Sequence, residues 1–275
     1  MDPILDPLND AQREAVLHGE GPLLVLAGAG SGKTRVIVHR VAHLVRDRGI
    51  LPWHLLGVTF TNKAAGEMRE RLERLLGAAA QDLWVQTFHA FGARFLRREA
   101  PRAGLESGFA IYDDGDQVAL VKRILADLGL DDGLLSPRQA LSQIDRWKNG
   151  SLLPDDVRPE AGEADPERAL EVYRRYQAAL RRAGAVDFGD LLLLPRRLLE
   201  EDQELRRRWA GRSGTSWWTS SRTPTPPSSA WCSCSAASGG TSARWGTTTR
   251  PSTPGAAPRC RTSSTSTGTS PVPRW

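Results

Sequence analysis

An apolar segment followed by a turn of small residues constrains this chain most strongly. The segment is Leu23-Leu24-Val25-Leu26, and the turn after it is Ala27-Gly28-Ala29-Gly30-Ser31-Gly32. Lys33 and Thr34 come next, and the amphipathic pattern from Val36 to Val45 predicts a helix. A strand, a glycine-rich turn and a helix in this order form a P-loop, whose backbone N–H groups and helix N-terminus surround a phosphate.

This motif predicts a nucleotide site that takes ATP with Mg²⁺ as its cofactors. The backbone of Ala27, Gly28, Ala29, Gly30, Ser31 and Gly32 is expected to bind phosphate. Lys33 is expected to reach the β- and γ-phosphates, and the Thr34 hydroxyl to bind the metal. Ala27 departs from the pattern G-x-x-x-x-G-K-[ST], which begins with glycine. The alternative is a glycine-rich turn between a strand and a helix that binds nothing.

Composition favours a cytoplasmic protein that does not enter a membrane. No stretch approaches the ~20 apolar residues of a membrane span, and the acidic start, Met1-Asp2-Pro3-Ile4-Leu5-Asp6, lacks the apolar core of a signal peptide. The net charge of +5 comes from the tail after Arg212, which holds six Arg and no Asp or Glu. Residues 1–212 carry 31 basic side chains against all 32 acidic ones. The three Cys also lie in the tail, at spacings that do not favour a metal site.

Strands and helices alternate over the first hundred residues. The segments Leu55–Phe60 and Leu83–Phe88 have the pattern of buried strands, and helices are expected after Thr61 and from His89 to Arg98. Such alternation predicts an α/β fold with a parallel sheet covered by helices. We therefore divide the chain into an α/β domain at 1–100, a helical insertion at 101–186, a return to the first domain at 187–212 and a tail at 213–275. Helix-start signals at Ser136 and Asp165 support the insertion.

Five motifs in order resemble the superfamily 1 DNA helicases of the UvrD/PcrA/Rep type. They are Leu8-Asn9-x-x-Gln12, residues 27–34, Val58-Thr59-Phe60-Thr61-Asn62-Lys63-Ala64-Ala65, Thr87-Phe88-His89 and Asp187-Phe188-x-Asp190-Leu191. The resemblance covers about residues 1–212. It implies the N-terminal part of an ATP-dependent DNA helicase that moves 3′→5′ along single-stranded DNA, with an incomplete RecA-like P-loop NTPase domain.

The resemblance also implies roles for single residues. Gln12 would hydrogen-bond the adenine edge, and Arg35 would flank the base. The DNA-binding residues would be Phe60, Thr61, Asn62, Thr87 and His89, with Phe60 stacking on a base. Plainer alternatives exist: Phe60 could be a core residue, His89 a core or N-cap histidine, and Gln12 an ordinary helix residue. Asp187 and Asp190 are expected to start a helix rather than to act in catalysis.

The tail has the composition of a sequence translated in the wrong frame. Joining the third base of each codon to the first two of the next turns Trp217-Trp218-Thr219 into Val-Asp, and the steps to Thr225 permit Glu-Phe-Gln-Asp-Thr-Asn, the helicase Walker B motif. The same shift of reading frame over Arg244–Pro258 permits the sequence motif that follows Walker B in these helicases. We infer a frameshift near residue 212; the alternative is a low-complexity tail.

This tail is expected to be disordered, because one aliphatic side chain and five Trp offset little of the entropy lost on ordering 63 residues. The first domain would then lose its central strands and expose apolar edges, leaving a monomer or an aggregation-prone chain. Without Walker B and a second motor domain, the chain is expected not to unwind DNA.

Three other functions stay open. One is the helicase subunit of a nuclease-coupled recombination enzyme, and another is a non-catalytic fragment that binds nucleotide or DNA. A small-molecule kinase would leave the motifs at Phe60 and at Thr87-Phe88-His89 unexplained. Single-stranded DNA is the expected partner, and the sequence indicates no particular protein partner.

Overall fold

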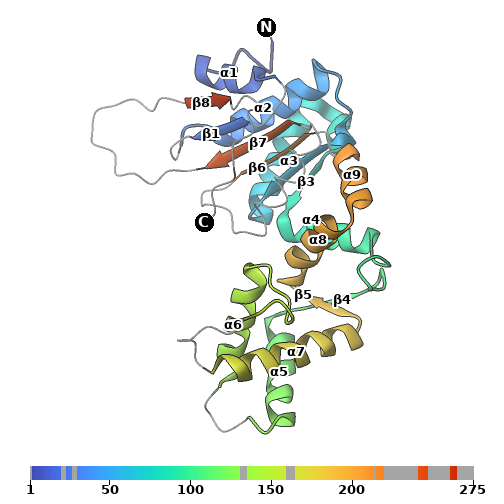
Figure 1. Ribbon diagram of the computed structural model, residues 1–275. Coiled ribbons are helices and arrows are strands. Elements are labelled where there is room, and N and C mark those ends of the chain that lie inside the picture. The colour runs from blue at the N-terminus through green and yellow to red at the C-terminus, as the bar shows by residue number, and fades with distance from the viewer. Residues whose placement is uncertain are drawn as a thin grey trace, which may run out of the picture. The chain divides into compact units, whose positions relative to one another are not determined.

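The computed structural model describes residues 2–19, 23–26, 30–130, 135–158, 165–212, 215–219, 241–246 and 261–264 (Figure 1). The chain forms two compact units. Among the described residues, the first unit contains those up to Thr87 and those from Arg206 onward, and the second contains 88–205. Within these ranges, no helix is both long and apolar enough to cross a bilayer.

The first unit is built on a sheet whose strands lie in the order β3-β2-β6-β7-β1-β8. The strands are β1 (Leu23–Leu26), β2 (Leu55–Thr59), β3 (Trp84–Thr87), β6 (Thr215–Thr219), β7 (Thr241–Gly246) and β8 (Arg261–Ser264). All neighbours run parallel except β8, which pairs with β1 in the antiparallel sense. The carboxyl ends of β1, β2 and β3 therefore meet at one edge, which is where parallel sheets bind ligands.

The helices of the first unit are α1 (Asp10–Leu17), α2 (Lys33–Arg46) and α3 (Asn62–Leu76), with short 3₁₀ helices at Pro52–His54 and Gly77–Asp82. Helix α9 (Gln203–Arg212) begins at the end of the second unit. α1 packs on α2, and α2 packs on α3. Their apolar faces bury a core that includes Val16, Val25, Ile37, Val41 and Leu72. The expected strand–turn–helix at the P-loop and the expected parallel sheet are thus confirmed.

The expectation of a wholly disordered tail is wrong for three segments, because residues 215–219, 241–246 and 261–264 form β6, β7 and β8. β6 and β7 lie between β2 and β1, so the expected unpaired edges at this place are occupied. Thr and Trp favour extended backbone, and the backbone groups of β1 and β2 need partners whatever the side chains are. The remaining residues after Arg212, including the three Cys, lie outside the described part of the chain.

The second unit is mainly helical. Its elements are α4 (Phe88–Arg98), β4 (Ala110–Tyr112), α5 (Asp114–Asp127), α6 (Pro137–Asn149), α7 (Pro166–Arg182), β5 (Ala185–Asp187) and α8 (Asp190–Glu201). Helices α5, α6 and α7 share a core that includes Val121, Ile144, Trp147, Tyr173 and Leu180. β4 and β5 form a small parallel pair that the sequence analysis did not predict.

Two details bear on the sequence-based expectations. Ser136 caps α6 with the predicted reciprocal bonds to Gln139, but Asp165 does not cap α7 with its side chain and instead pairs with Arg168 at 2.8 Å. The two compact units divide after Thr87 and Leu205, whereas the division of the sequence into domains at 100 and 186 stays a prediction. The units divide there because α4 packs on α8, which keeps both helices in the second unit.

Candidate functional site

The P-loop turn leads from the end of β1 into α2. Gly30 and Gly32 adopt φ values of +74° and +85°, a left-handed conformation that costs other residues about 1–2 kcal/mol. Gly32 is also the N-cap of α2, so the free N–H groups of the first helical turn lie next to Lys33 and Thr34. Ala27, Gly28 and Ala29, for which the motif predicts phosphate contacts, lie outside the described residues.

Gln12 is buried against this turn. Its side-chain nitrogen donates to the Ser31 carbonyl at 3.1 Å, and its side-chain oxygen accepts from the Asn9 N–H at 3.2 Å. Asn9 returns a bond to the Gln12 N–H at 2.9 Å, so the two residues form a capping box at the start of α1. A Cβ on Gly32 would lie 2.7 Å from the Gln12 nitrogen. A larger residue at this position would therefore displace the Gln12 amide as well as strain the turn.

Arg40 fixes the other end of α1. This buried side chain of α2 donates to the carbonyl groups of Ala15, Val16 and His18 at 3.1, 3.1 and 2.8 Å. These are carbonyls from the last turn of α1 and just beyond it, which have no partner within the helix. Burial lowers the pKa of Arg40 to about 10, which leaves it charged at neutral pH. Arg40 thus keeps α1, and Gln12 with it, beside the P-loop.

A cavity of about 460 Å³ opens at this turn. The residues that line it are Gln12, Gly30, Ser31, Gly32, Lys33, Thr34, Arg35 and Arg71. Burial lowers the pKa of Lys33 from its ordinary value, and Arg71 reaches the cavity from α3, where it pairs with Glu67 at 3.9 Å. Of the described residues in the lining, three are cationic and none is acidic. That charge, the helix N-terminus and the positive-φ glycines fit a polyphosphate.

The same residues fit a divalent cation less completely. Among the described residues, no group of three or more His, Cys, Asp or Glu side chains could hold a metal ion. The Thr34 hydroxyl is the metal-ligand type that the lining offers at the start of α2. A Mg²⁺ ion here would therefore depend on phosphate oxygens of the nucleotide and on water for its remaining ligands.

In the first unit, the expected DNA-binding residues follow β2 and β3. Phe60 comes directly after β2 and its side chain is 45% exposed, so the alternative of a core position does not hold. Thr61 caps α3 by accepting from the Ala64 N–H at 3.2 Å, and Asn62 is exposed in the first turn of α3. Thr87 ends β3 and is only 8% exposed, which leaves its side chain little surface for a ligand.

In the second unit, His89 and Phe188 form an exposed aromatic pair. The two rings pack edge to face with their centroids 5.9 Å apart, and Phe188 is 44% exposed. Burial of the ring lowers the pKa of His89, which favours the neutral imidazole. A Cβ on Gly92 would overlap the Leu191 carbonyl oxygen, so this glycine lets α4 approach the start of α8 closely. His89 itself is exposed, so the alternative of a core histidine does not hold.

Asp187 and Asp190 lie on either side of Phe188 and Gly189 in the chain. Both are buried, and each accepts from the other's backbone N–H, Asp187 from Asp190 at 2.8 Å and Asp190 from Asp187 at 3.4 Å. α8 begins at Asp190, so the expected helix-start role is confirmed for Asp190, whereas Asp187 ends β5 and accepts from the first N–H of the helix. Lys148, 1% exposed, also bridges the two carboxylates at 2.6 and 2.8 Å, a contact that the sequence analysis did not predict.

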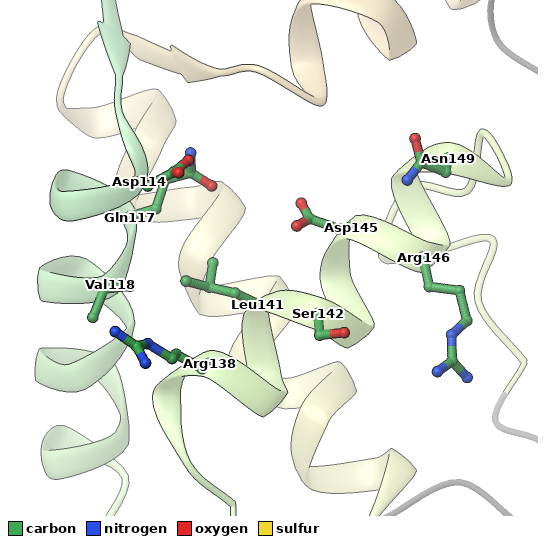
Figure 2. A pocket seen from close by; sticks show the side chains of 9 residues that line it. All are labelled: Asp114, Gln117, Val118, Arg138, Leu141, Ser142, Asp145, Arg146 and Asn149. Carbon is green, nitrogen blue, oxygen red and sulfur yellow. The ribbon is translucent and has the colours of Figure 1, made fainter. Parts of the chain in front are cut away.

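A second cavity, of about 640 Å³, lies between α5 and α6 of the second unit (Figure 2). Figure 2 shows the Asp145 carboxylate on the side of α6 that faces Asp114 and Gln117 of α5. Burial, with the nearby Asp187, raises the pKa of Asp145, and Lys148 opposes that shift. Arg138 and Arg146 also line the cavity, so its charges are mixed and favour no single class of ligand.

Four side chains that shape these sites were missed by the sequence analysis as site residues: Arg40, Arg71, Lys148 and Phe188. Arg71 and Arg40 lie on helices with many charged residues, where a local pattern does not separate a site residue from a solvated one. Phe188 lies inside the Asp187–Leu191 motif. If the two acids of this motif face inward, the residue between them faces outward, and this could have identified Phe188 as an exposed aromatic residue. The sequence around Lys148 indicated only that it lies near the C-terminus of a helix and did not identify it as part of a site.

Comparison with known proteins agrees with this geometry. Residues 8–214 match the family described as the UvrD/REP helicase N-terminal domain. Relatives named ATP-dependent DNA helicase PcrA include those of Leuconostoc citreum, 48% identical over 203 residues, and Bacillus subtilis (strain 168), 42% identical over 202 residues. Each match covers 74% of this chain and 27% of the relative, so the chain spans little more than a quarter of their length. The chain belongs to the UvrD/REP helicase N-terminal domain family.

Proposed function

We propose that residues up to about Arg212 are the ATP- and DNA-binding front part of a DNA helicase that moves 3′→5′ along single-stranded DNA. The observation that carries this proposal is the cationic cavity at the P-loop, lined by Lys33, Arg35 and Arg71 beside the α2 N-terminus. The names of the PcrA relatives, which couple ATP to DNA unwinding, support it.

The cavity geometry suggests how ATP lies. In this arrangement the backbone of residues 30–32 lies against the phosphates, with Lys33 on the β- and γ-phosphates and Thr34 toward Mg²⁺, and the motif adds the backbone of residues 27–29. Arg71 adds a second cation on the phosphate side. Gln12 bonds the adenine edge and Arg35 flanks the base; the contact of the Gln12 amide with the turn and the place of both residues in the cavity lining support these roles.

Single-stranded DNA binds through exposed aromatic rings and polar groups that contact the backbone. Phe60 in the first unit and Phe188 with His89 in the second offer faces on which bases can stack. Thr61 and Asn62 are exposed beside Phe60 and contact phosphates or sugars without distinguishing sequence. Thr87 is largely buried, so it joins them only through the small part of its surface that stays exposed. Such contacts suit a motor that must move along any sequence.

We further propose that a frameshift near residue 212 produced the tail. The family match ends at residue 214, two residues beyond the inferred shift. In the alternative frame, the Asp-Glu pair of Walker B falls between Trp218 and Ser220, at the carboxyl end of β6 and at the same edge of the sheet as the P-loop. The nucleotide sequence around codons 205–220 tests this proposal directly: a frame that fails to encode Asp-Glu there refutes it.

As written, the 275 residues bind ATP and DNA without unwinding, because no acidic residue follows Arg212 to assist hydrolysis. A nuclease-coupled recombination helicase is the second candidate, since it shares the same front motifs.

The test of the nucleotide site is binding of a fluorescent ATP analogue to the full chain. Lys33→Ala is expected to weaken binding by about 10–100-fold, the value of a charge-assisted contact. Lys122→Ala, an exposed lysine on α5, is the matched control and should bind as the wild type does. Equal affinity of the Lys33→Ala and wild-type chains would refute the site, and ATP-dependent unwinding by this chain would refute its inactivity.

A further inference from the structure

We propose that Lys148 is a positioning residue that holds Phe188 in place for stacking on a base of single-stranded DNA. This inference rests on the proposed function, in which Phe188 contacts DNA. Lys148 itself is 1% exposed and touches no ligand, so it acts through the turn that carries Phe188.

The turn from Asp187 to Asp190 is closed by its two acids. Their reciprocal backbone bonds enclose Phe188 and Gly189, and the N–H groups of Leu192 and Leu193 donate to the Gly189 carbonyl at 3.1 and 3.0 Å. The conformation of Phe188 therefore depends on where the two carboxylates lie.

Lys148 fixes both carboxylates at once. Its ammonium group is 2.6 Å from Asp187 and 2.8 Å from Asp190, and it comes from α6, about 40 residues earlier in the chain. A Cβ on Gly189 would lie 2.8 Å from the Lys148 side chain, so this glycine lets the lysine stem lie directly against the turn. The lysine thus contacts both the acids and the backbone that present Phe188.

Helix α7 holds the same carboxylates from another side. The Tyr176 hydroxyl donates to Asp187 at 2.9 Å, and the Gln177 amide donates to Asp190 at 3.2 Å. These neutral groups orient the acids, but among the described residues around them Lys148 is the cation within ion-pair distance of both. Phe188 thereby projects from a rigid turn toward His89, and its ring stays exposed rather than collapsing into the core.

The test is a double-mutant cycle on the full chain, measured as the affinity for a labelled oligo(dT) by fluorescence anisotropy. Phe188→Ala is expected to weaken binding by about 5–100-fold, the range for one stacked base. Lys148→Met is expected to cause a loss of at least about fivefold in the wild-type background. In the Phe188→Ala background, the same lysine substitution should change affinity by less than about twofold, because there is no ring left to position.

A matched control separates positioning from general loss of stability. Leu180→Ala removes buried packing on α7 without touching the turn. Each variant is assayed at the same interval below its own melting temperature, so that Leu180→Ala and Lys148→Met are compared at matched stability. The control should retain oligo(dT) affinity.

Three outcomes overturn the inference: a Lys148→Met effect that persists in the Phe188→Ala background, unchanged affinity of Lys148→Met, or an equal loss in the Leu180→Ala chain. Unchanged affinity of the Phe188→Ala chain would instead refute the DNA contact of the proposed function.

Discussion

Replacing Lys148 with Met should destabilise the second unit in a way that depends on pH. The wild-type lysine is buried with two carboxylates, and removing one partner of such a group costs about 3–5 kcal/mol. For a unit of this size, that corresponds to a fall in melting temperature of roughly 10–20 °C. The cost arises because Asp187 and Asp190 then share a buried site with no cation between them.

The pH dependence follows from the groups around the lysine. Burial lowers the pKa of Lys148, but Asp190 and Asp187 outweigh burial and the net shift is upward. Its stabilising effect is therefore present below the lysine's unfolded pKa of 10.5 and is lost only as pH rises through the folded value. Burial raises the pKa of Asp190, and the nearby Asp145 shifts the same way. Tyr173 and Tyr176, which face the lysine, stay protonated because burial raises the pKa of each.

In the Lys148→Met chain, one carboxylate of the pair should take up a proton well above the usual Asp range. Because the folded chain then binds this proton more tightly than the unfolded chain does, the free energy of unfolding falls as pH rises from the unfolded pKa of the carboxyl group to its folded pKa. The gain on acidification is about 1.4 kcal/mol per pH unit. Going from about pH 7.5 to about pH 5.5 should thus recover roughly 2–3 kcal/mol of the loss.

Thermal melting of the full chain by circular dichroism measures this effect, with hydrogen exchange of α7 peptides to assign it to the second unit. The triple variant Lys148→Met, Asp187→Asn, Asp190→Asn is the control, because it removes the buried charges but keeps the hydrogen-bonding shape; it should recover much of the stability and lose the pH dependence. A Lys148→Met loss that is equal at both pH values would refute the reasoning.

Three further predictions concern other parts of the chain. Gly32→Ala should weaken ATP binding at least about tenfold, since it adds about 1–2 kcal/mol of backbone strain and displaces Gln12; titration with a fluorescent ATP analogue measures this, and unchanged affinity would contradict it. Gly92→Ala should lower the melting temperature and oligo(dT) affinity together, because its Cβ separates α4 from Leu191; a fall in neither would count against the contact. A chain that ends at Arg212 should show faster hydrogen exchange in β2 than the full chain, because it lacks β6; equal exchange would show that the tail strand adds no protection.

The parts of the fold that depend on local sequence were predictable. The P-loop needs an apolar strand, small residues at positive φ and a helix start, all within residues 23–34, and the structure has them in that order. The capping box at Ser136 and the helix start at Asp190 are likewise short-range patterns. By contrast, β4 and β5 have three residues each, too few for a period to be visible.

Contacts between distant residues were not predictable. Lys148 meets its acids across 39 and 42 residues, and Arg40 reaches carbonyls more than 20 residues earlier. Nothing in a single sequence indicates that Lys148 pairs with these acids or that Arg40 pairs with these carbonyl groups. The prediction of a disordered tail was wrong for β6, β7 and β8 for a related reason. Side-chain burial alone gave too little stabilisation, but the backbone of β1 and β2 offered hydrogen bonds that an extended segment such as β6 can use.

The most direct test of the central claim is hydrogen–deuterium exchange of the full chain with ATP and with oligo(dT), added separately. The account predicts that ATP slows exchange at Gln12 and over residues 30–35, and that oligo(dT) slows exchange at residues 60–62 and around Phe188. Protection by ATP that spares residues 30–35, or protection by oligo(dT) at neither aromatic site, would contradict the account.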